Sequence, residues 1–411
     1  MRILKVVFVF ALIIACSPLL TAQKLMQEIT VSMPKHKANE PSIAINPKNN
    51  LNIVIATNTN HVYWTKNGGK KFKHYTAKSS LGVYGDPVVM FDEKGICYFV
   101  HLAEAKNKTW PSFFDQIVVQ KSLNKGKSFD DGIGIGKNGK MQDKAWLSIH
   151  NNQLNISWTE FDKYGSKAQT DSSRILFSSI KNNIATMPVQ VNDLNGNCID
   201  SDSTMEGATT CVGNHGEIYM AWAGNEKLFF DKSLDNGKTW GTDQVIAQTP
   251  KGWDLTLPDF YRTNGMPFLA IDKKQTLYCC AAFEQNNINQ VVVFESNNKG
   301  EAWQKTNFPL LDSTTQYMMP HAYMDKTTGN YYVLYYGVKN GWIDVYLSYK
   351  LQHATEFKTI RINEKSSQVP NKEIFFGDYI NVCAVGNTIA MVWTEATKYS
   401  TVVKFRKMEL E

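Results

Sequence analysis

Beyond its N-terminal leader, the sequence contains no run of the ~18 to 20 apolar residues that a membrane-spanning helix needs. It also has no C-x-x-C pair, so nothing supports a zinc–thiolate site or thioredoxin-like chemistry. Charge is nearly balanced, and the net charge of +6 slightly favours acidic ligands but is too small to indicate nucleic acid. A hydrophobic content of 43% with 12% aromatic residues excludes a disordered chain.

The first residues have the features of a secretion signal. Two cations precede the apolar run Val6–Ala15, and a stretch rich in small residues follows it. The segment Leu20–Ala22 suits an ordinary signal peptidase, whereas the apolar residues before Cys16 resemble a lipobox. We predict a signal peptide over residues 1–22 and an exported protein, periplasmic or secreted. The alternative is an outer-membrane lipoprotein anchored through Cys16.

Six cysteines remain beyond the leader. Four of them sit inside apolar strand patterns, which predicts packed thiols. Cys198 and Cys211 could instead bridge a long loop in an oxidising compartment. The four cysteines in strand patterns are Cys97, Cys279, Cys280 and Cys383.

One eight-residue pattern occurs four times, with a hydroxyl first, Asn or Asp third, Gly fifth and a large aromatic last. An Asn or Asp side chain can bond its own backbone two residues on, Gly takes a positive φ, and the aromatic packs into the layer beneath. We therefore predict four hairpin turns between outer strands, repeated at the period of a propeller or array. The copies span Thr65–Phe72, Ser122–Phe129, Ser233–Trp240 and Ser296–Trp303.

These four copies resemble the Asp-boxes, or bacterial neuraminidase repeats, of sialidase-like β-propellers. The resemblance implies a scaffold and says nothing by itself about catalysis, because the box is structural. More narrowly, the chain resembles secreted seven-bladed propellers of carbohydrate metabolism in marine bacteria. Those include polysaccharide lyases and an ulvan-oligosaccharide dehydratase, which act on glycans that contain uronic acids.

A second repeat gives the number of blades. Seven short segments lead from small or acidic residues into an apolar run, and each is followed by a turn and two further strand-like runs rich in branched and aromatic residues. We predict an all-β, seven-bladed β-propeller of four-stranded antiparallel blades, in one domain over residues 23–411. The N-terminal strand within Leu25–Met33 is expected to join the last blade and close the ring. The segments are Glu40–Asn46, Gly85–Phe91, Asp143–Ile149, Glu206–Val212, Gly265–Ile271, Met318–Met324 and Phe376–Val382.

Propeller topology gathers the starts of the inner strands and the ends of the second strands on one face, here called the upper face. Glu40 and Asp143 start inner strands there, although such polar residues also bond neighbouring blades. The loop Gly252–Gly265 adds stacking and carboxylate-binding groups above the mouth. We predict His321, Tyr379 and Arg262 as catalytic residues. The predicted substrate-binding residues are Asp86, Lys144, Trp146, Arg174, Glu206, Trp253, Tyr261 and Asp378.

The sialidase apparatus is largely missing. The resemblance would imply three arginines that clamp the sialate carboxylate, the first of them in an Arg-Ile-Pro motif. No Arg-Ile-Pro occurs, and four arginines remain beyond the leader. Lysine does not replace a bidentate guanidinium, because the planar fork matches a carboxylate. The resemblance therefore extends to the scaffold and not to this site. The four arginines are Arg174, Arg262, Arg361 and Arg406.

The resemblance to uronate-active propellers leads to a hypothesis of elimination, by a lyase or dehydratase, on acidic oligosaccharides such as those of ulvan. Elimination at a uronate needs a cation on the carboxylate, a base for the C5 proton and an acid for the leaving oxygen. Arg262, or else Arg174 or Lys144, would bind the carboxylate. Either His321 or Tyr379 would be the base, and the other would be the acid. A paired-carboxylate glycoside hydrolase and a non-catalytic glycan-binding propeller are the alternatives.

No cofactor or catalytic metal is predicted, and the protein is expected to be a monomer. The loop Asn192–Gly207 is rich in acidic side chains and could hold a structural calcium ion, although its spacing is not that of an EF-hand. Solvated loop acids are the commoner explanation of such a composition. The expected partner is an acidic oligosaccharide or polysaccharide.

Overall fold

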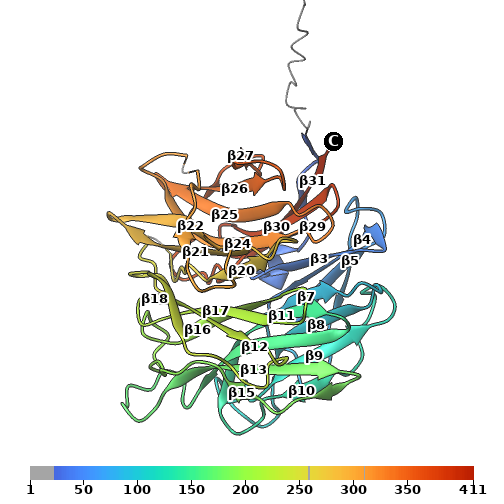
Figure 1. Ribbon diagram of the computed structural model, residues 1–411. Coiled ribbons are helices and arrows are strands. Elements are labelled where there is room, and N and C mark those ends of the chain that lie inside the picture. The colour runs from blue at the N-terminus through green and yellow to red at the C-terminus, as the bar shows by residue number, and fades with distance from the viewer. Residues whose placement is uncertain (1–22, 258–259, 310) are drawn as a thin grey trace, which may run out of the picture.

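The computed structural model describes residues 23–257, 260–309 and 311–411 (Figure 1). The predicted signal peptide and Cys16 lie outside the described residues. The described chain is built from β-strands, with one short 3-10 helix, η1 (Pro34–His36). A search of these residues finds no helix with the length and apolarity to cross a membrane.

Seven antiparallel sheets follow one another along the chain; in each, three successive strands run outwards from the inner strand, and in the last sheet the outermost strands come from the N-terminal end. This confirms the predicted seven-bladed β-propeller of four-stranded blades. The first three blades are β3 (Ser42–Asn46), β4 (Asn49–Thr57), β5 (His61–Thr65) and β6 (Lys73–Thr76); β7 (Val88–Phe91), β8 (Cys97–Leu102), β9 (Ile117–Ser122) and β10 (Ile133–Ile135); and β11 (Met141–His150), β12 (Gln153–Phe161), β13 (Ser173–Lys181), β14 (Ile184–Ala185) and β15 (Val189–Gln190).

The other four blades complete the ring. They are β16 (Glu206–Val212), β17 (Ile218–Gly224), β18 (Lys227–Ser233) and β19 (Gln244–Gln248); β20 (Phe268–Ile271), β21 (Leu277–Gln285), β22 (Ile288–Ser296) and β23 (Gln304–Lys305); β24 (Gln316–Met324), β25 (Tyr331–Lys339), β26 (Trp342–Lys350), β27 (Lys358–Arg361) and β28 (Ser367–Gln368); and β29 (Asn381–Val385), β30 (Thr388–Ala396) and β31 (Thr401–Leu410) with β1 (Gln23–Leu25) and β2 (Ile29–Thr30).

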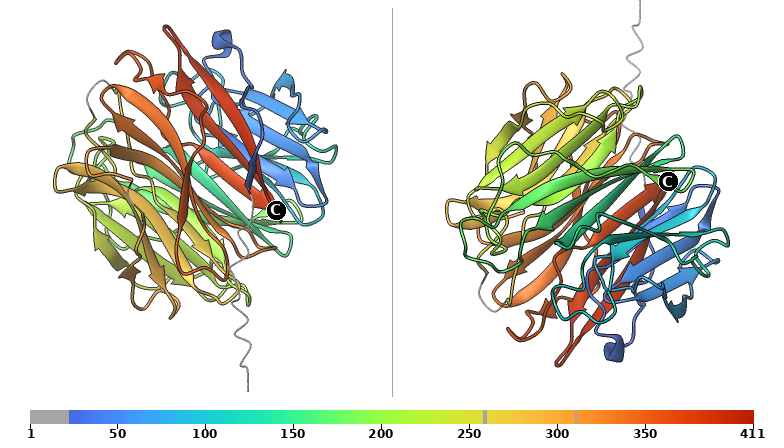
Figure 2. Two further views of the ribbon diagram at one scale, coloured as in Figure 1. Left: turned by 90° about the horizontal axis from the view of Figure 1, so that it is seen from above. Right: turned by 90° about the horizontal axis from the view of Figure 1, so that it is seen from below.

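The ring closes between the first and last blades. Both β1 and β2 pair antiparallel with β31, with Gln23 opposite Leu410 and Ile29 opposite Phe405. The inner strand β29 of the last blade contacts β3 of the first. Figure 2 shows the N-terminal strand beside the C-terminal strands, so the predicted closure is present, as two short strands instead of one.

The four repeated turns share one hydrogen-bond pattern. The third residue's side-chain oxygen accepts a bond from the backbone N–H four residues on, as in Asp235 Oδ1 with Thr239 N at 2.9 Å, and not two residues on as predicted. In three copies the first hydroxyl also accepts from the glycine N–H, as in Ser233 with Gly237 at 2.8 Å. Gly237 has φ +85°, which confirms the predicted positive φ, and a Cβ there would meet the Phe177 ring of the preceding blade at 2.0 Å.

The core lies between the blades. Second strands such as β17 and β25 are buried nearly throughout, because neighbouring blades cover both of their faces. Trp158, Trp222 and Trp393, all in second strands, are among the largest fully buried side chains. All six cysteines of the described residues are buried free thiols, so Cys198 and Cys211 are not bridged.

Candidate functional site

Several inner strands have a left-handed residue just before or near their upper end, and this shapes the upper mouth. Glu40, Asp86, Lys144 and Met319 occupy this position in four blades, with φ between 47° and 51°. Non-glycine residues in this conformation are strained and need support from their surroundings. A cluster of charged side chains lies beside these sharp backbone bends.

Asp378, which precedes β29, is fully buried and lies at the centre of this cluster. Its carboxylate accepts hydrogen bonds from Lys144 Nζ and from the guanidinium of Arg262, whose Nε lies 2.9 Å from Oδ1. Its backbone N–H donates to Glu40 Oε1 at 3.0 Å. Lys144 Nζ also lies 3.7 Å from Asp86 Oδ2. Groups from two other blades and one loop therefore contact Asp378 directly, and the second blade joins them through the contact of Asp86 with Lys144.

Arg262 also joins this centre to the loop Asn192–Gly207. Its NH1 group donates to Asp200, whose carboxylate also accepts from Tyr164 OH at 2.8 Å and from Trp253 Nε1 at 2.9 Å. We call Glu40, Asp86, Asp143, Lys144, Asp200, Glu206, Arg262, Asp378 and Tyr379 the mouth cluster. It contains six carboxyl groups and two cations, so it is rich in acid.

The pKa values of the carboxyl groups in the mouth cluster are shifted in opposite directions. Burial would raise the pKa of Asp378, but Arg262 and Lys144 together hold it below its usual range. Burial raises the pKa of Glu206 well above its usual value, with further contributions from Asp200 and Asp143. Glu40 and Asp143 have raised pKa values for the same first reason, and each is further raised by Asp86.

Three groups of the cluster have buried atoms with no hydrogen-bond partner among the described residues. They are the carboxyl of Glu206, at both oxygens, the phenol of Tyr379, and Oδ2 of Asp86, which lies 3.7 Å from Lys144 Nζ. Burial, with Glu40 and Asp86 nearby, raises the pKa of Tyr379 well above its usual value, so the phenol keeps its proton. Buried groups that bond no protein atom are uncommon in native proteins and call for an explanation.

His321 is placed apart from Arg262. The His321 ring contacts the rings of Trp146 and Phe268, and its Nδ1 accepts from the Val382 N–H at 3.2 Å. Burial lowers its pKa to about 3. Trp146 contacts both His321 and Tyr379.

His321 and Trp146 line a central cavity of about 440 Å3, which extends along the inner strands to the turns of the lower face, such as Asp92–Lys94 and Asp325–Thr327. Arg262 and Tyr379 are not among the residues that line it. The structure therefore brings together Arg262 and Tyr379 and leaves His321 on the channel side.

The remaining predicted ligand contacts divide by exposure. Trp253 is buried, so its ring has no free face for a sugar, and Trp146 is buried at the wall of the central cavity, whereas Tyr261 is 68% exposed. Tyr261 contacts Phe375, and the guanidinium of Arg262 lies over the same ring. Arg174 belongs to a separate ion cluster with Glu160 and Asp162.

Asp200 is a member of the mouth cluster and Tyr164 is its neighbour. The sequence analysis placed neither of them at the mouth. Asp200 was assigned to a loop of solvated acids or a calcium site, but its carboxylate bonds protein donors. Asp202 of the same loop accepts from the Trp253 and Asp254 N–H groups. In the sequence, this contact could have been inferred from the many acidic residues of the loop Asn192–Gly207 and from Arg262, the one arginine of the loop Gly252–Gly265.

No protein-family model matches the chain, and no curated protein matches it in sequence. Solved structures show the same fold. An ulvan lyase, solved with a -[GlcA(1-4)Rha3S]- ligand, is 11% identical with a TM-score of 0.56 and covers 92% of this chain and 95% of its own. A Dyadobacter fermentans protein of unknown function is 10% identical with a TM-score of 0.53, over 95% and 99% of the two chains.

A third similar structure is an α-L-arabinofuranosidase from Fusarium graminearum, solved as a mutant with an iminosugar inhibitor. It is 12% identical with a TM-score of 0.51, over 81% of this chain and 99% of its own. At these identities the likeness shows a shared fold alone and leaves the chemistry to the residues of the site.

Proposed function

We propose that the protein is an exported carbohydrate-active enzyme whose mouth cluster performs acid–base chemistry on an oligosaccharide through carboxyl groups. The similar structures that carry lyase and glycosidase activities support a saccharide as substrate. The observation that carries the proposal is the contrast, within one cluster, between Asp378, whose pKa is held below its usual range, and Glu206, whose pKa is raised well above it. Two carboxyl groups with pKa values pushed apart are the arrangement of an acid and a base or nucleophile.

Hydrolysis of a glycosidic bond is the reaction that this charge distribution supports best. A protonated carboxyl such as Glu206 would protonate the leaving oxygen, and an ionised one would activate water or attack the sugar. Both oxygens of Glu206 are buried and bond no protein atom among the described residues, so a substrate would have to open the mouth to reach this carboxyl. The exposed ring of Tyr261 would supply a surface for the sugar beside Arg262.

Elimination at a uronate is the second candidate, and the unpartnered phenol of Tyr379 favours it. Because Tyr379 keeps its proton, it would act as the acid on the leaving oxygen and not as the base. A uronate carboxylate would have to displace Asp378 or Asp200 from Arg262. That competition, in a cluster with more acids than cations, ranks elimination below hydrolysis.

The test is to incubate the purified protein with neutral and uronic-acid oligosaccharides and to follow ultraviolet absorbance and product mass together. Products heavier by one water for each cut, without absorbance, would establish hydrolysis. Absorbance of an unsaturated uronate would establish elimination, with loss of water if the reaction is dehydration. Binding without turnover across the panel would contradict both candidates and indicate a glycan-binding propeller.

Glu206→Gln is the decisive variant, because it preserves shape and removes the acid. We expect turnover to fall by about 10²- to 10⁴-fold, the usual contribution of a general acid. Glu356→Gln is the matched control at an exposed glutamate with no side-chain bond, and it should leave turnover unchanged. Full turnover of Glu206→Gln would remove Glu206 from the mechanism, and Tyr379→Phe would then show whether the phenol is the acid.

A further inference from the structure

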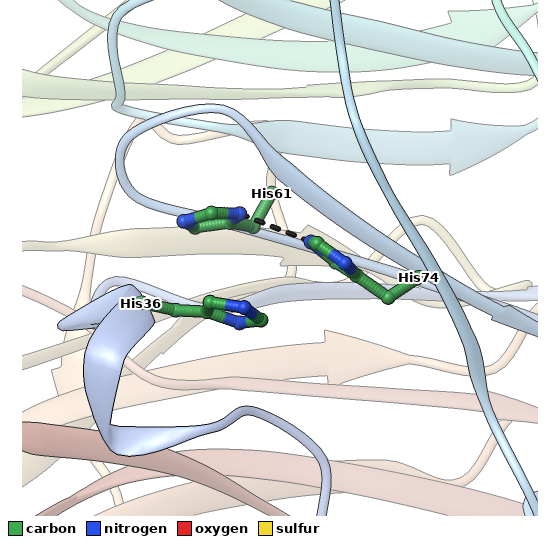
Figure 3. A group of neighbouring side chains, drawn as sticks. All are labelled: His36, His61 and His74. Atoms are coloured by element: carbon green, nitrogen blue, oxygen red, sulfur yellow. Dashed lines mark hydrogen bonds between the residues drawn. The ribbon is translucent and has the colours of Figure 1, made fainter.

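Three of the eight histidines of the chain meet at the edge of the first blade, away from the mouth cluster. His61 lies at the start of β5, His74 lies on β6, and His36 ends η1 in the segment that leads from the closing strands to β3. One ring nitrogen from each lies within 4.8 Å of the corresponding nitrogens of the other two (Figure 3). This is the one such group of potential ligands found within residues 23–257, 260–309 and 311–411.

The spacing of two of these nitrogens suits a metal ion. His61 Nδ1 and His74 Nε2 are 3.0 Å apart (Figure 3). Two nitrogens bound at 2.0–2.1 Å to a tetrahedral zinc ion would be roughly 3.3 Å apart. An ion between them would replace the proton that the two neutral rings now share. Because β5 and β6 are paired strands, the pair is built on a rigid part of the blade.

Tyr63 gives the third histidine an outer-shell partner. His36 Nδ1 lies 2.7 Å from the hydroxyl of the largely buried Tyr63, which leaves Nε2 of the same ring for a ligand. A metal-binding histidine commonly has its second nitrogen bonded in this way. The His36 ring lies face to face with the other two, with centroids 4.3 and 4.5 Å away, so binding requires it to turn about its side-chain bonds.

The chemical state of the three rings also suits a metal. Burial lowers the pKa of His61 to about 4, and burial lowers the pKa values of His36 and His74 as well, with Lys35 and the neighbouring rings adding to the effect. The neutral imidazole is the form that binds metal ions. Imidazole nitrogens suit zinc, copper and nickel better than calcium or magnesium.

We propose that His36, His61 and His74 form a binding site for one divalent transition-metal ion of the zinc class. Three imidazoles leave a fourth tetrahedral position for water or another ligand. The ion would tie the segment between the closing strands and β3 to the outer strands of the first blade. The site is independent of the proposed reaction at the mouth cluster, so either can fail without the other.

The test is calorimetric titration of metal-free protein, purified without a polyhistidine tag, with Zn²⁺ alone. We expect one ion bound per chain and a rise in the thermal midpoint when zinc is added. His61→Ala and His74→Ala should each weaken binding by more than the roughly 10- to 100-fold that loss of an outer-shell partner costs. Tyr63→Phe should fall within that range.

His353→Ala is the matched control, because His353 is an exposed histidine outside the cluster. It should bind zinc as the unaltered protein does. Circular dichroism and the thermal midpoint in chelator establish that each variant is folded. Absence of stoichiometric zinc binding by the folded, unaltered protein would overturn the proposal. Equal binding by the unaltered protein and by both histidine variants would overturn it too.

Discussion

The two faces of the ring use repetition in opposite ways. On the lower face, the four repeated turns carry nearly the same residues, and their hydroxyl, amide and carboxylate groups bond one another within each turn. On the upper face, equivalent positions at the starts of inner strands carry residues as different as Glu40, Lys144 and Met319. There the bonds run between blades, and three groups have buried atoms with no hydrogen-bond partner in the part of the chain that the structure describes.

The comparison separates residues that build the scaffold from residues that the scaffold displays. A turn whose polar groups are all satisfied locally gains stability from each bond and can be copied into another blade without change. A cluster with surplus buried acid costs free energy and is retained only where it has a use. The sharpest tests of this division compare stability with activity for one change on each face.

Asp378→Asn should have the largest effect. The change leaves Lys144 and Arg262 buried without their shared carboxylate, and breaking a buried ion pair at one partner costs about 3–5 kcal/mol. Urea unfolding measures the loss, and turnover should be abolished as well. At pH values above the ordinary aspartate pKa, Asp378 stabilises the folded state. This stabilisation is lost as the pH falls towards the lowered pKa of Asp378. A variant as stable as the parent would show that the contacts of Asp378 with Lys144 and Arg262 do not stabilise the fold.

Gly237→Ala should have the next largest effect, and on stability alone. A side chain there adopts an unfavourable positive φ and meets the Phe177 ring, for a combined cost of about 2–4 kcal/mol. Gly139→Ala is the matched control, since Gly139 has φ +89° and no atom within 4 Å of its added Cβ. The difference between their unfolding free energies isolates the contact between blades. If Gly237→Ala lost turnover at an equal folded fraction, the lower-face turns would affect activity as well, which would contradict the division between the two faces.

Glu206→Gln should have the smallest effect on stability, and a distinctive one. A raised folded-state pKa means that the contribution of Glu206 is fully present below its unfolded value and is lost as the pH rises through the folded value. The parent protein should therefore lose stability on this rise, by at most about 1.4 kcal/mol per pH unit from this group. The variant should lack that slope. Identical pH profiles in thermal unfolding would show that Glu206 is already ionised in the native state.

The fold could be predicted because its signals are local. A hydroxyl, an Asx residue and a glycine at fixed offsets specify a turn, and the strands are rich in branched and aromatic residues between turns. Seven such units in succession leave little choice of architecture. The hydrogen bond that Asp235 accepts from the backbone N–H four residues on was mispredicted. Two successive positive-φ residues, Asn236 and Gly237, redirect the backbone N–H groups of the turn.

The site could be predicted in part. Asp86, Lys144, Glu206, Asp378 and Tyr379 were placed at the mouth because inner strands start there by topology. The position of Asp200 depends on how a long loop folds against Arg262, which no local pattern encodes.

The histidines were harder to place. His321 follows an irregularity in β24 after Met318, and such a shift changes which way a side chain faces. The meeting of His36 with His74 depends on contacts between segments distant in sequence.

The closing strands β1 and β2 cover the outer edge of the last blade by pairing with β31. A chain that lacked β1 and β2 would leave the edge of β31 with unpaired backbone groups, and such an edge accepts a strand from another molecule. A free peptide spanning Gln23–Met33 could then complete the ring from outside. Two damaged chains could instead exchange or stack their edges. The edge that closes one ring would therefore determine how two such chains associate once their N-terminal strands were cut away.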